Sequence, residues 1–235
     1  MKKFHRNGLH WVMVIALIAA APKWWNQRVH QETSYRTAQF RPLWVVQPVK
    51  ENMELQLLNG DTLKLEQLKF YVSHMTLLLN GKVMWRSDEE GQLIDALHPE
   101  KSSIRLPAIP CNELRFLVGL DSATNCSGNF NGALDPVHGM FWSWQSGFIH
   151  FKIEGTSTAC TERNNRFQYH LGGYRKPYET SDTVSIPITS GESIGIPLHV
   201  DRYFSLCSPA QQGHVMSPGK NAKELFQHAL KMFAP

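Results

Sequence analysis

The sequence predicts an all-β protein in which two antiparallel sheets pack as a β-sandwich, immunoglobulin- or cupredoxin-like, with a short C-terminal helix. About eight short strand-like runs follow one another along the chain, with turn signals between them. The chain has 235 residues, which is ample for a buried core. Helical spacing of apolar side chains is found near the end, over residues 221–233. These observations favour one sandwich domain over two small β domains.

The aromatic stretch over residues 135–155 forms the centre of the predicted sheets. It opens on an Asp-Pro turn, glycines divide it, and aromatic and β-branched residues fill the runs between them. Strand alternation places Trp142 and Trp144 on one face, where two indoles dominate any core or cleft that they meet. After Gly147, alternation predicts that Ile149, Phe151 and Ile153 face inward, and that Phe148, His150, Lys152 and Glu154 face outward.

Further strands are predicted on both sides of this centre. Residues 70–79 are apolar on both faces, which indicates a central strand, and Asn80-Gly81 predicts a primed turn into a hairpin with residues 82–86. We expect the first strand over residues 45–58 and a loop over residues 121–134. The remaining strands are expected over residues 103–106, 113–120, 166–171, 184–188 and 194–204.

The first 21 residues have the pattern of an export segment. Basic residues over positions 1–6 precede an almost uninterrupted apolar run over residues 9–21. This run is shorter than the roughly 20 residues of a membrane span and is typical of a signal-peptide core. Trp24 and Trp25 follow, and paired tryptophans also suit an uncleaved anchor at a membrane interface. We therefore expect a signal peptide or an N-terminal membrane anchor over residues 1–21, and export to the periplasm.

The positive charge of the chain belongs to its first 50 residues. They carry eight Lys and Arg against one acid, whereas the rest of the chain has a net charge of −3. A nucleic-acid-binding protein needs a basic face on its folded domain, so this class is excluded. Residues 22–44 are mostly polar, and we expect them to be a linker. The folded domain is then expected over residues 45–235.

Four cysteines are spaced widely along the chain, and none forms a C-x-x-C pair. Zinc knuckles, thioredoxin-type redox motifs and covalent haem attachment are therefore absent from the sequence. In an exported chain an even number of cysteines suggests two disulfides, and the spacing leaves all three connectivities open. The disulfide candidates are Cys111, Cys126, Cys160 and Cys207.

Histidines are the candidates for chemistry. No established catalytic motif is found, such as G-x-S-x-G, H-E-x-x-H or a P-loop, so we do not expect an enzyme. A neutral imidazole binds copper and zinc alike, and alternation places three histidines on the polar faces of strands that could be neighbours. A fourth lies in the turn before Met140. These four candidate ligands are His150, His170, His199 and His138. The alternative is that they are unrelated solvated side chains.

Several motifs resemble those of one known family. The segment Gly139-Met-Phe-Trp-Ser-Trp-Gln-Ser-Gly-Phe-Ile149, followed by Lys152-Ile-Glu-Gly155, is similar to the signature of MbnP-like proteins. These form the periplasmic copper-protein family associated with methanobactin operons. Softer matches, which extend over most of residues 50–205, are Phe70-Tyr-Val-Ser73, Phe116-Leu-Val-Gly-Leu-Asp121, Leu134-Asp-Pro136 and Tyr169-His-Leu-Gly-Gly173.

The resemblance implies a periplasmic β-sandwich and copper binding in some members. It also implies a partner similar to di-haem cytochrome c peroxidases that oxidises a tryptophan to kynurenine. Trp142 and Trp144 fall in the signature, and His170 takes the position of the family's histidine before paired glycines. The chain departs from the family in two ways. The segment after Gly173 lacks the cysteine of one branch, and neither signature tryptophan precedes a histidine by two residues.

Two functions therefore compete. In the first, the protein is a periplasmic or membrane-tethered copper-binding β-sandwich that works with the haem partner, and two or three of the four histidines are ligands. In the second, it is a non-catalytic binding module, and Trp142, Trp144 and Tyr169 form an aromatic platform for a glycan or a protein. Converging histidines would favour the first function, and an exposed shelf of tryptophans would favour the second.

Overall fold

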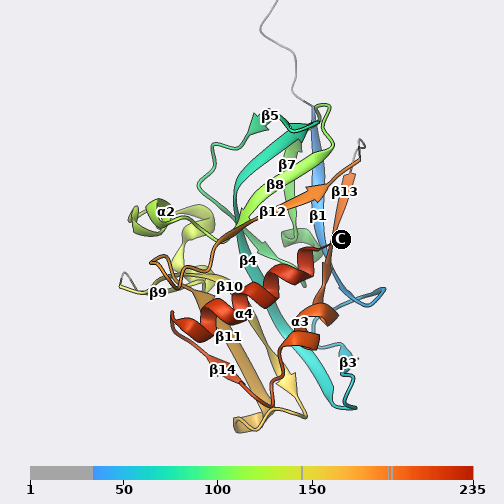
Figure 1. Ribbon diagram of the computed structural model, residues 1–235, viewed down its shortest axis with the longest axis vertical. Coiled ribbons are helices and arrows are strands. Elements are labelled where there is room, and N and C mark those ends of the chain that lie inside the picture. Colours follow the sequence, from blue (N-terminus) through green and yellow to red (C-terminus); the bar gives the residue numbers. More distant parts are fainter. Residues whose placement is uncertain (1–33, 144, 190, 192, 235) are drawn as a thin grey trace, which may run out of the picture. The chain divides into compact units, whose positions relative to one another are not determined.

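The strands of this protein form two mixed sheets (Figure 1). The computed structural model describes residues 34–143, 145–189, 191 and 193–234. Sheet A is built on β1 (Tyr35–Trp44), which pairs with parallel β13 (Ser193–His199) on one edge and antiparallel β7 (Ser103–Pro107) on the other. The two-residue strand β2 (Gln47–Pro48) pairs with the last residues of β1.

Sheet B is built on the long strand β4 (Thr62–Leu79). β10 (Gly147–Ser157) pairs with the first half of β4, and β8 (Glu113–Val118) pairs with its second half. β11 (Arg166–Gly172) lies beyond β10, and β12 (Asp182–Pro187) lies beyond β8. The shorter strands of this sheet are β3 (Glu54–Gln56), β5 (Lys82–Arg86), β6 (Gln92–Asp95), β9 (Phe141–Ser143) and β14 (His214–Val215).

The described helices are short. α4 (Lys220–Leu230) packs against β11, and α3 (Val200–Leu206) follows β13 directly. α2 (Ser122–Cys126) opens the segment that covers the other face of sheet B, and the Asp121 carboxylate caps it by accepting a hydrogen bond from Thr124 N. Single 3₁₀ turns are η1 (Pro99–Lys101), η2 (Gly132–Leu134), η3 (Pro136–His138), η4 (Arg163–Asn165) and η5 (Lys231–Phe233). Among the described residues, no helix combines the length and the apolarity that a membrane crossing requires.

The main core lies between sheet A, sheet B and the C-terminal helix. Phe40 of β1 meets Phe70 of β4 edge to face, with the ring centroids 5.3 Å apart. Phe151 of β10 stacks on Phe70 at 5.1 Å, and Phe233 of η5 packs edge-on against the same ring at 5.5 Å. Such aromatic pairs stabilise the core beyond the area that they bury. The phenylalanines therefore join the two sheets and fix the C-terminal segment to them.

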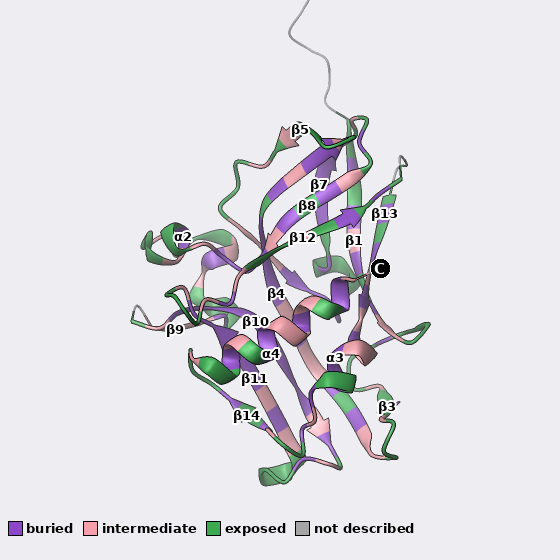
Figure 2. Cartoon of the chain, in the orientation of Figure 1, coloured by how far each residue is buried: buried purple, intermediate pink, exposed green. Residues whose placement is uncertain are grey.

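A second, smaller core lies on the opposite face of sheet B. Tyr71 and Phe148 pack edge to face at 5.9 Å, and Leu134 and Met140 cover them. The Tyr71 hydroxyl donates a hydrogen bond to Ala133 O at 3.0 Å, which holds this cover in place. Strand β10 is consequently buried on both faces, as Figure 2 shows.

The structure confirms the mostly-β, sandwich-like fold and the short C-terminal helix. The hairpin at Asn80-Gly81 is also confirmed, because both residues have positive φ, at 51° and 77°, and connect β4 to β5. Both sheets are mixed rather than purely antiparallel, because β13 pairs parallel to β1 and β14 pairs parallel to β11.

Four predictions at the level of single elements are wrong. The first strand is β1, at residues 35–44, so the folded unit begins inside the expected linker 22–44 and not at residue 45. The predicted strand over residues 194–204 ends at His199 and continues as α3, and the predicted loop over residues 121–134 contains α2. The four β10 residues expected to face outward are buried: Phe148, His150, Lys152 and Glu154. Residues of the segment 121–143 contact the first three of them, through Leu134 and Met140, Asn125, and Gly139 respectively. The expected export segment, residues 1–21, lies outside the described residues.

Candidate functional site

A group of buried charged side chains lies on the covered face of sheet B. Lys152 and Glu154 project from β10, and His170 projects from the neighbouring strand β11. The register of the two strands sets Lys152 directly opposite His170. All three side chains are buried, and buried charged groups require partners.

Glu154 is the centre of this group. Its Oε1 accepts a hydrogen bond from His170 Nε2 at 2.6 Å and lies 3.3 Å from Lys152 Nζ. Its Oε2 lies 3.3 Å from Arg166 Nη2, and that guanidinium also bonds Glu66 at 2.6 Å. Burial opposes ionisation of Glu154, but the His170 hydrogen bond and the Lys152 charge outweigh it and lower the pKa of Glu154 to about 2. The carboxylate is therefore ionised at any physiological pH.

The second nitrogen of His170 has no such partner. Nδ1 is buried and has no hydrogen-bond partner among the described residues. Because the ionised Glu154 is an acceptor only, Nε2 of His170 carries the proton of this hydrogen bond, and in the neutral form of the ring the lone pair lies at Nδ1. A histidine that ligates a metal characteristically donates its other ring N–H to a carboxylate, which fixes the tautomer and raises the basicity of the ligand nitrogen. His170 and Glu154 have this arrangement, so an imidazole ligand at this position fits a metal ion.

The signature loop closes over this group. Gly139 has a left-handed backbone, with φ 68°, and its carbonyl accepts a hydrogen bond from Lys152 Nζ at 3.2 Å. The six-membered ring of Trp142 packs on Gly172, and a Cβ added to that glycine would lie 2.7 Å from the ring. Gly172 follows His170 by two positions on β11, so Trp142 packs on the face of the strand that carries His170.

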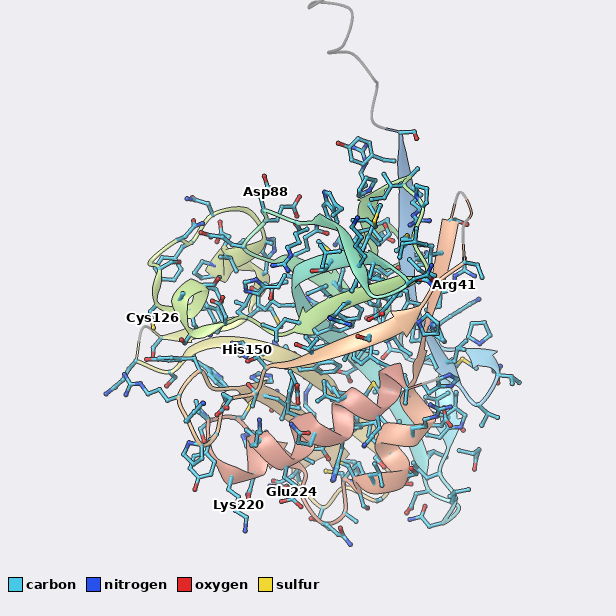
Figure 3. The ribbon with its side chains drawn as sticks, turned by 45° about the horizontal axis from the view of Figure 1, so that its top comes forward. Arg41, Asp88, Cys126, His150, Lys220 and Glu224 are labelled. Carbon is cyan, nitrogen blue, oxygen red and sulfur yellow. The ribbon has the colours of Figure 1, made fainter. Side chains whose placement is uncertain are left out.

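His150, in contrast, is a satisfied core histidine. Its Nδ1 donates to Thr180 O at 3.1 Å, and its Nε2 accepts from Asn125 Nδ2 at 2.6 Å. Burial lowers the pKa of His150 to about 4, although the Thr180 hydrogen bond opposes this shift. Both ring nitrogens are occupied, so no lone pair is left for a metal. Figure 3 shows His150 inside the molecule and Cys126 at the surface of the covering segment.

The other two candidate histidines lie elsewhere. His138 is exposed on η3, where its Nε2 bonds Gly132 O at 3.0 Å. His199 ends β13 of sheet A and precedes α3, whereas His150 and His170 belong to sheet B. In the part of the chain that the structure describes, no three His, Cys, Asp or Glu side chains gather as a metal site. The four predicted ligands are therefore not brought together.

The predicted disulfides are wrong. All four cysteines are free, and three of them are buried while Cys126 is exposed. The buried Cys111 thiol contacts the guanidinium of Arg36.

The expected aromatic platform is also not formed by the residues that the structure describes. Tyr169 is fully buried in the main core, and Trp142 is half-buried with its indole N–H enclosed. Trp144 lies outside the described residues.

Sequence reasoning missed the partners of His170. Alternation had placed Lys152, Glu154 and His170 on the same, non-core faces of two strands. Two adjacent strands that each present charged residues on one face predict an ion pair between them. The sequence contains this signal, but using it requires knowing that β10 pairs with β11.

The fold and the site define an all-β protein with a carboxylate-anchored histidine buried beneath an aromatic signature loop. The MbnP family model matches residues 33–217, and the chain therefore belongs to the MbnP family. MbnP from Methylosinus trichosporium has a similar fold, with a TM-score of 0.50 and 15% sequence identity. The match covers 65% of this chain and 71% of that chain. No curated protein sequence matches the chain.

Proposed function

We propose that this protein binds copper in the periplasm and that His170 is the anchoring ligand. The observation that carries the proposal is the Glu154–His170 pair, in which Nε2 bonds the carboxylate at 2.6 Å while the buried Nδ1 has no described partner. An enclosed lone pair without a donor costs free energy, and a metal ion relieves that cost. The resemblance to MbnP-like proteins supports copper over the other metals that imidazole binds.

The donor set favours a carrier of copper over a closed storage site. Structural metal sites are closed by a full set of protein ligands, whereas a site with an open position exchanges its ligands. No third His, Cys, Asp or Glu among the described residues completes a metal site with His170. A donor from an incoming copper complex, or from a partner, would supply the remaining coordination.

The proposal includes an oxidising partner similar to a di-haem cytochrome c peroxidase. Trp142 supports this part, because its ring packs on Gly172, on the face of β11 that carries His170. A modified Trp142 would present its new polar groups next to that histidine.

Copper titration of the full chain tests the function. His170→Gln removes the Nδ1 ligand. His138→Gln is the matched control, because His138 is exposed and its Nε2 bonds the Gly132 carbonyl instead of a carboxylate. We expect the first variant to lose at least tenfold in copper affinity and the second to retain it. A circular-dichroism melt of each variant separates lost binding from lost folding. Equal affinity in folded wild type and folded His170→Gln would overturn the proposal.

A further inference from the structure

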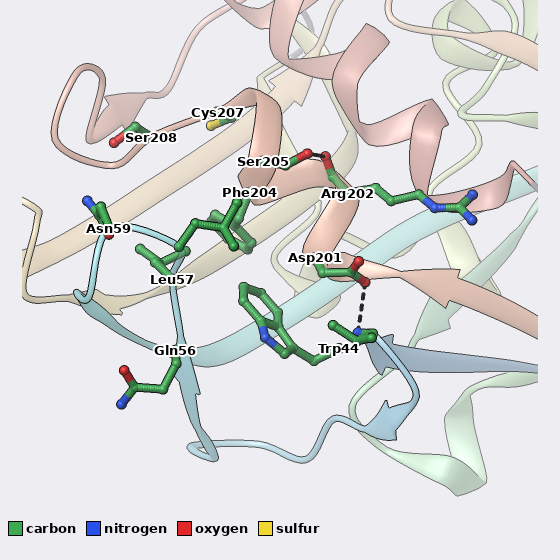
Figure 4. Close-up of a pocket in the computed structure, with 12 residues that line it drawn as sticks. Trp44, Gln56, Leu57, Asn59, Asp201, Arg202, Phe204, Ser205, Cys207 and Ser208 are labelled. Carbon is green, nitrogen blue, oxygen red and sulfur yellow. Dashed lines mark hydrogen bonds between the residues drawn. The ribbon is translucent and has the colours of Figure 1, made fainter.

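An apolar cavity lies between the end of β1, the turn after β3 and α3 (Figure 4). Its volume of ≈ 340 Å³ is in the range of clefts that hold small ligands. Trp44, Leu57 and Phe204 form its apolar wall. None of the residues that line it belongs to the group around Glu154, so the cavity is a separate site.

Two aromatic rings form one corner of this cavity. Trp44 is the last residue of β1 and Phe204 lies on α3, and their ring centroids are 6.3 Å apart with the planes tilted by 40°. The face of an aromatic ring attracts a cation, and tryptophan does so most strongly. An ammonium group with apolar substituents suits such a corner, because the rings contact both its charge and its substituents.

The same wall carries the negative charge that a cation requires. Asp201 precedes Phe204 by three positions on α3, which places both on one side of the helix. The Asp201 carboxylate accepts a hydrogen bond from Val45 N at 3.1 Å, and no cation pairs with it among the residues that the structure describes. The other charged residue of the lining is Arg202, whose guanidinium donates to Ala234 O and points away from the two rings (Figure 4).

The opening of the cavity carries aliphatic side chains. Val45 and Leu58 line the cavity, yet they are 61% and 100% exposed. Val45 has φ 59°, a left-handed conformation that a β-branched residue rarely adopts, and its bond to Asp201 supports it there. Exposed aliphatic groups around a concave site offer surface to the apolar part of a ligand. The geometry therefore fits a ligand that combines a positive charge with an apolar chain.

We propose that this cavity binds a free organic ammonium ion that carries an apolar chain. The ammonium pairs with the Asp201 carboxylate and contacts the rings of Trp44 and Phe204. The chain lies against Leu58 at the opening. A phospholipid headgroup is a poorer fit, because its phosphate requires a cation and the guanidinium of the lining already donates to a carbonyl.

Calorimetric titration of the full chain with choline and with 3,3-dimethylbutan-1-ol tests the charge. The two molecules have the same shape, and only choline is a cation. We expect choline to bind about tenfold more tightly than the alcohol. Asp201→Asn should abolish this preference and leave the affinity for the alcohol unchanged, because the amide oxygen still accepts from Val45 N. Asp88→Asn is the matched control, at an exposed carboxylate outside the lining. Equal affinities in wild type, or an Asp201→Asn variant that keeps the preference, would overturn the proposal.

Hexyltrimethylammonium tests the apolar chain. It should bind about tenfold more tightly than choline, because the hexyl group buries apolar surface at the opening. Leu58→Ser should remove most of this gain and leave the affinity for choline unchanged. Leu58 is fully exposed, so the substitution does not disturb the core. A gain that is the same in Leu58→Ser and wild type overturns the proposal, because the chain then binds elsewhere.

Two further measurements distinguish the other occupants of an apolar cavity. Sedimentation analysis should show a monomer, and a dimer that Leu58→Ser dissociates would assign the cavity to a second copy of the chain. Phosphatidylcholine vesicles should float without the protein. Co-flotation that Asp201→Asn abolishes would assign the cavity to a lipid headgroup, and either result overturns the free ligand.

Discussion

His150 and His170 are both buried, in the adjacent strands β10 and β11, and they differ in the hydrogen-bond partners of their ring nitrogens. His150 has a hydrogen-bond partner on each ring nitrogen, namely Thr180 O and Asn125 Nδ2. His170 has a carboxylate on Nε2 and no described partner on Nδ1. Neither residue type nor burial separates the two, since both are buried histidines. The partners of each nitrogen decide which histidine holds the fold together and which is available to a ligand.

Of the substitutions that test this comparison, Glu154→Gln should lower the free energy of unfolding most. It removes the carboxylate that bonds His170 Nε2. The amide cannot neutralise Lys152, whose ammonium lies 3.3 Å from the carboxylate in a buried position. Breaking one side of a buried ion pair costs about 3 kcal/mol, because it leaves an uncompensated charge. Urea denaturation at pH 7 measures this loss in the free energy of unfolding.

The control for Glu154→Gln is Glu54→Gln, whose ion pair with Lys64 is exposed and should contribute less than about 1 kcal/mol. Under the proposed function, copper affinity should also fall by roughly 10- to 100-fold, because the carboxylate orients His170. A variant that is as stable as wild type would show that Lys152 is solvated in the folded protein.

His150 should dominate the pH dependence between pH 6.5 and 4. Its pKa falls from 6.5 in the unfolded chain to about 4 in the folded protein, so the unfolded chain binds the extra proton in this range. The contribution of His150 to the free energy of unfolding is therefore fully present above pH 6.5. It is lost as the pH falls from 6.5 to 4, and the loss is about 3 kcal/mol. Urea unfolding at several pH values measures the slope.

His150→Gln should remove this slope while lowering stability at pH 7, and His138→Gln, at an exposed histidine, should leave it intact. Glu154 contributes in the same direction but at lower pH. Its pKa of about 2 means that its stabilisation is lost only as the pH falls from about 4.5 toward 2. A slope in the His150→Gln variant equal to that of wild type would assign the titration to another group.

Much of the fold was predictable because its signals are local. Asn80-Gly81 determines a primed turn by its own backbone preference, and the spacing of apolar residues in 221–233 predicts α4. Val200, Tyr203 and Phe204 have helical spacing too, so α3 was predictable had the preceding strand been ended at His199. The start of β1 inside a polar segment was not predictable, because its partners β7 and β13 are distant in the sequence.

The site was only partly predictable, because it depends on non-local pairing. Alternation correctly grouped Lys152 with Glu154, and the family signature pointed to His170. Residues 121–143 cover this face with short elements only, namely α2, η2, η3 and β9, so the sequence pattern did not show that the face is covered. The polar face of β10 was therefore predicted to be exposed to solvent. The disulfides were a separate error: they were predicted from the number of cysteines alone, and all four thiols are free.

His98 extends the comparison to a histidine near the surface, and its substitution should change the free energy of unfolding least. Its Nδ1 lies 2.9 Å from Asp95 Oδ1 and its Nε2 lies 3.5 Å from Glu51 Oε2. The hydrogen bond and charge of Asp95, with a smaller contribution from Glu51, raise the pKa of His98 above 6.5. Its stabilisation is therefore complete below pH 6.5 and is lost as the pH rises through the folded-state pKa, which is the opposite sign to His150.

Because the His98 side chain is 38% exposed to solvent, we expect a contribution below about 1 kcal/mol that salt weakens. His98→Gln should lower the free energy of unfolding at pH 5 and leave it unchanged at pH 8.5, in paired urea titrations. An equal loss at both pH values would mean that His98 acts through packing and not through its charge. Asp95, beside the partly exposed His98, therefore changes only the pKa of that histidine. Glu154, beside the buried His170, also fixes which ring nitrogen carries the hydrogen-bonded proton and which has no described partner.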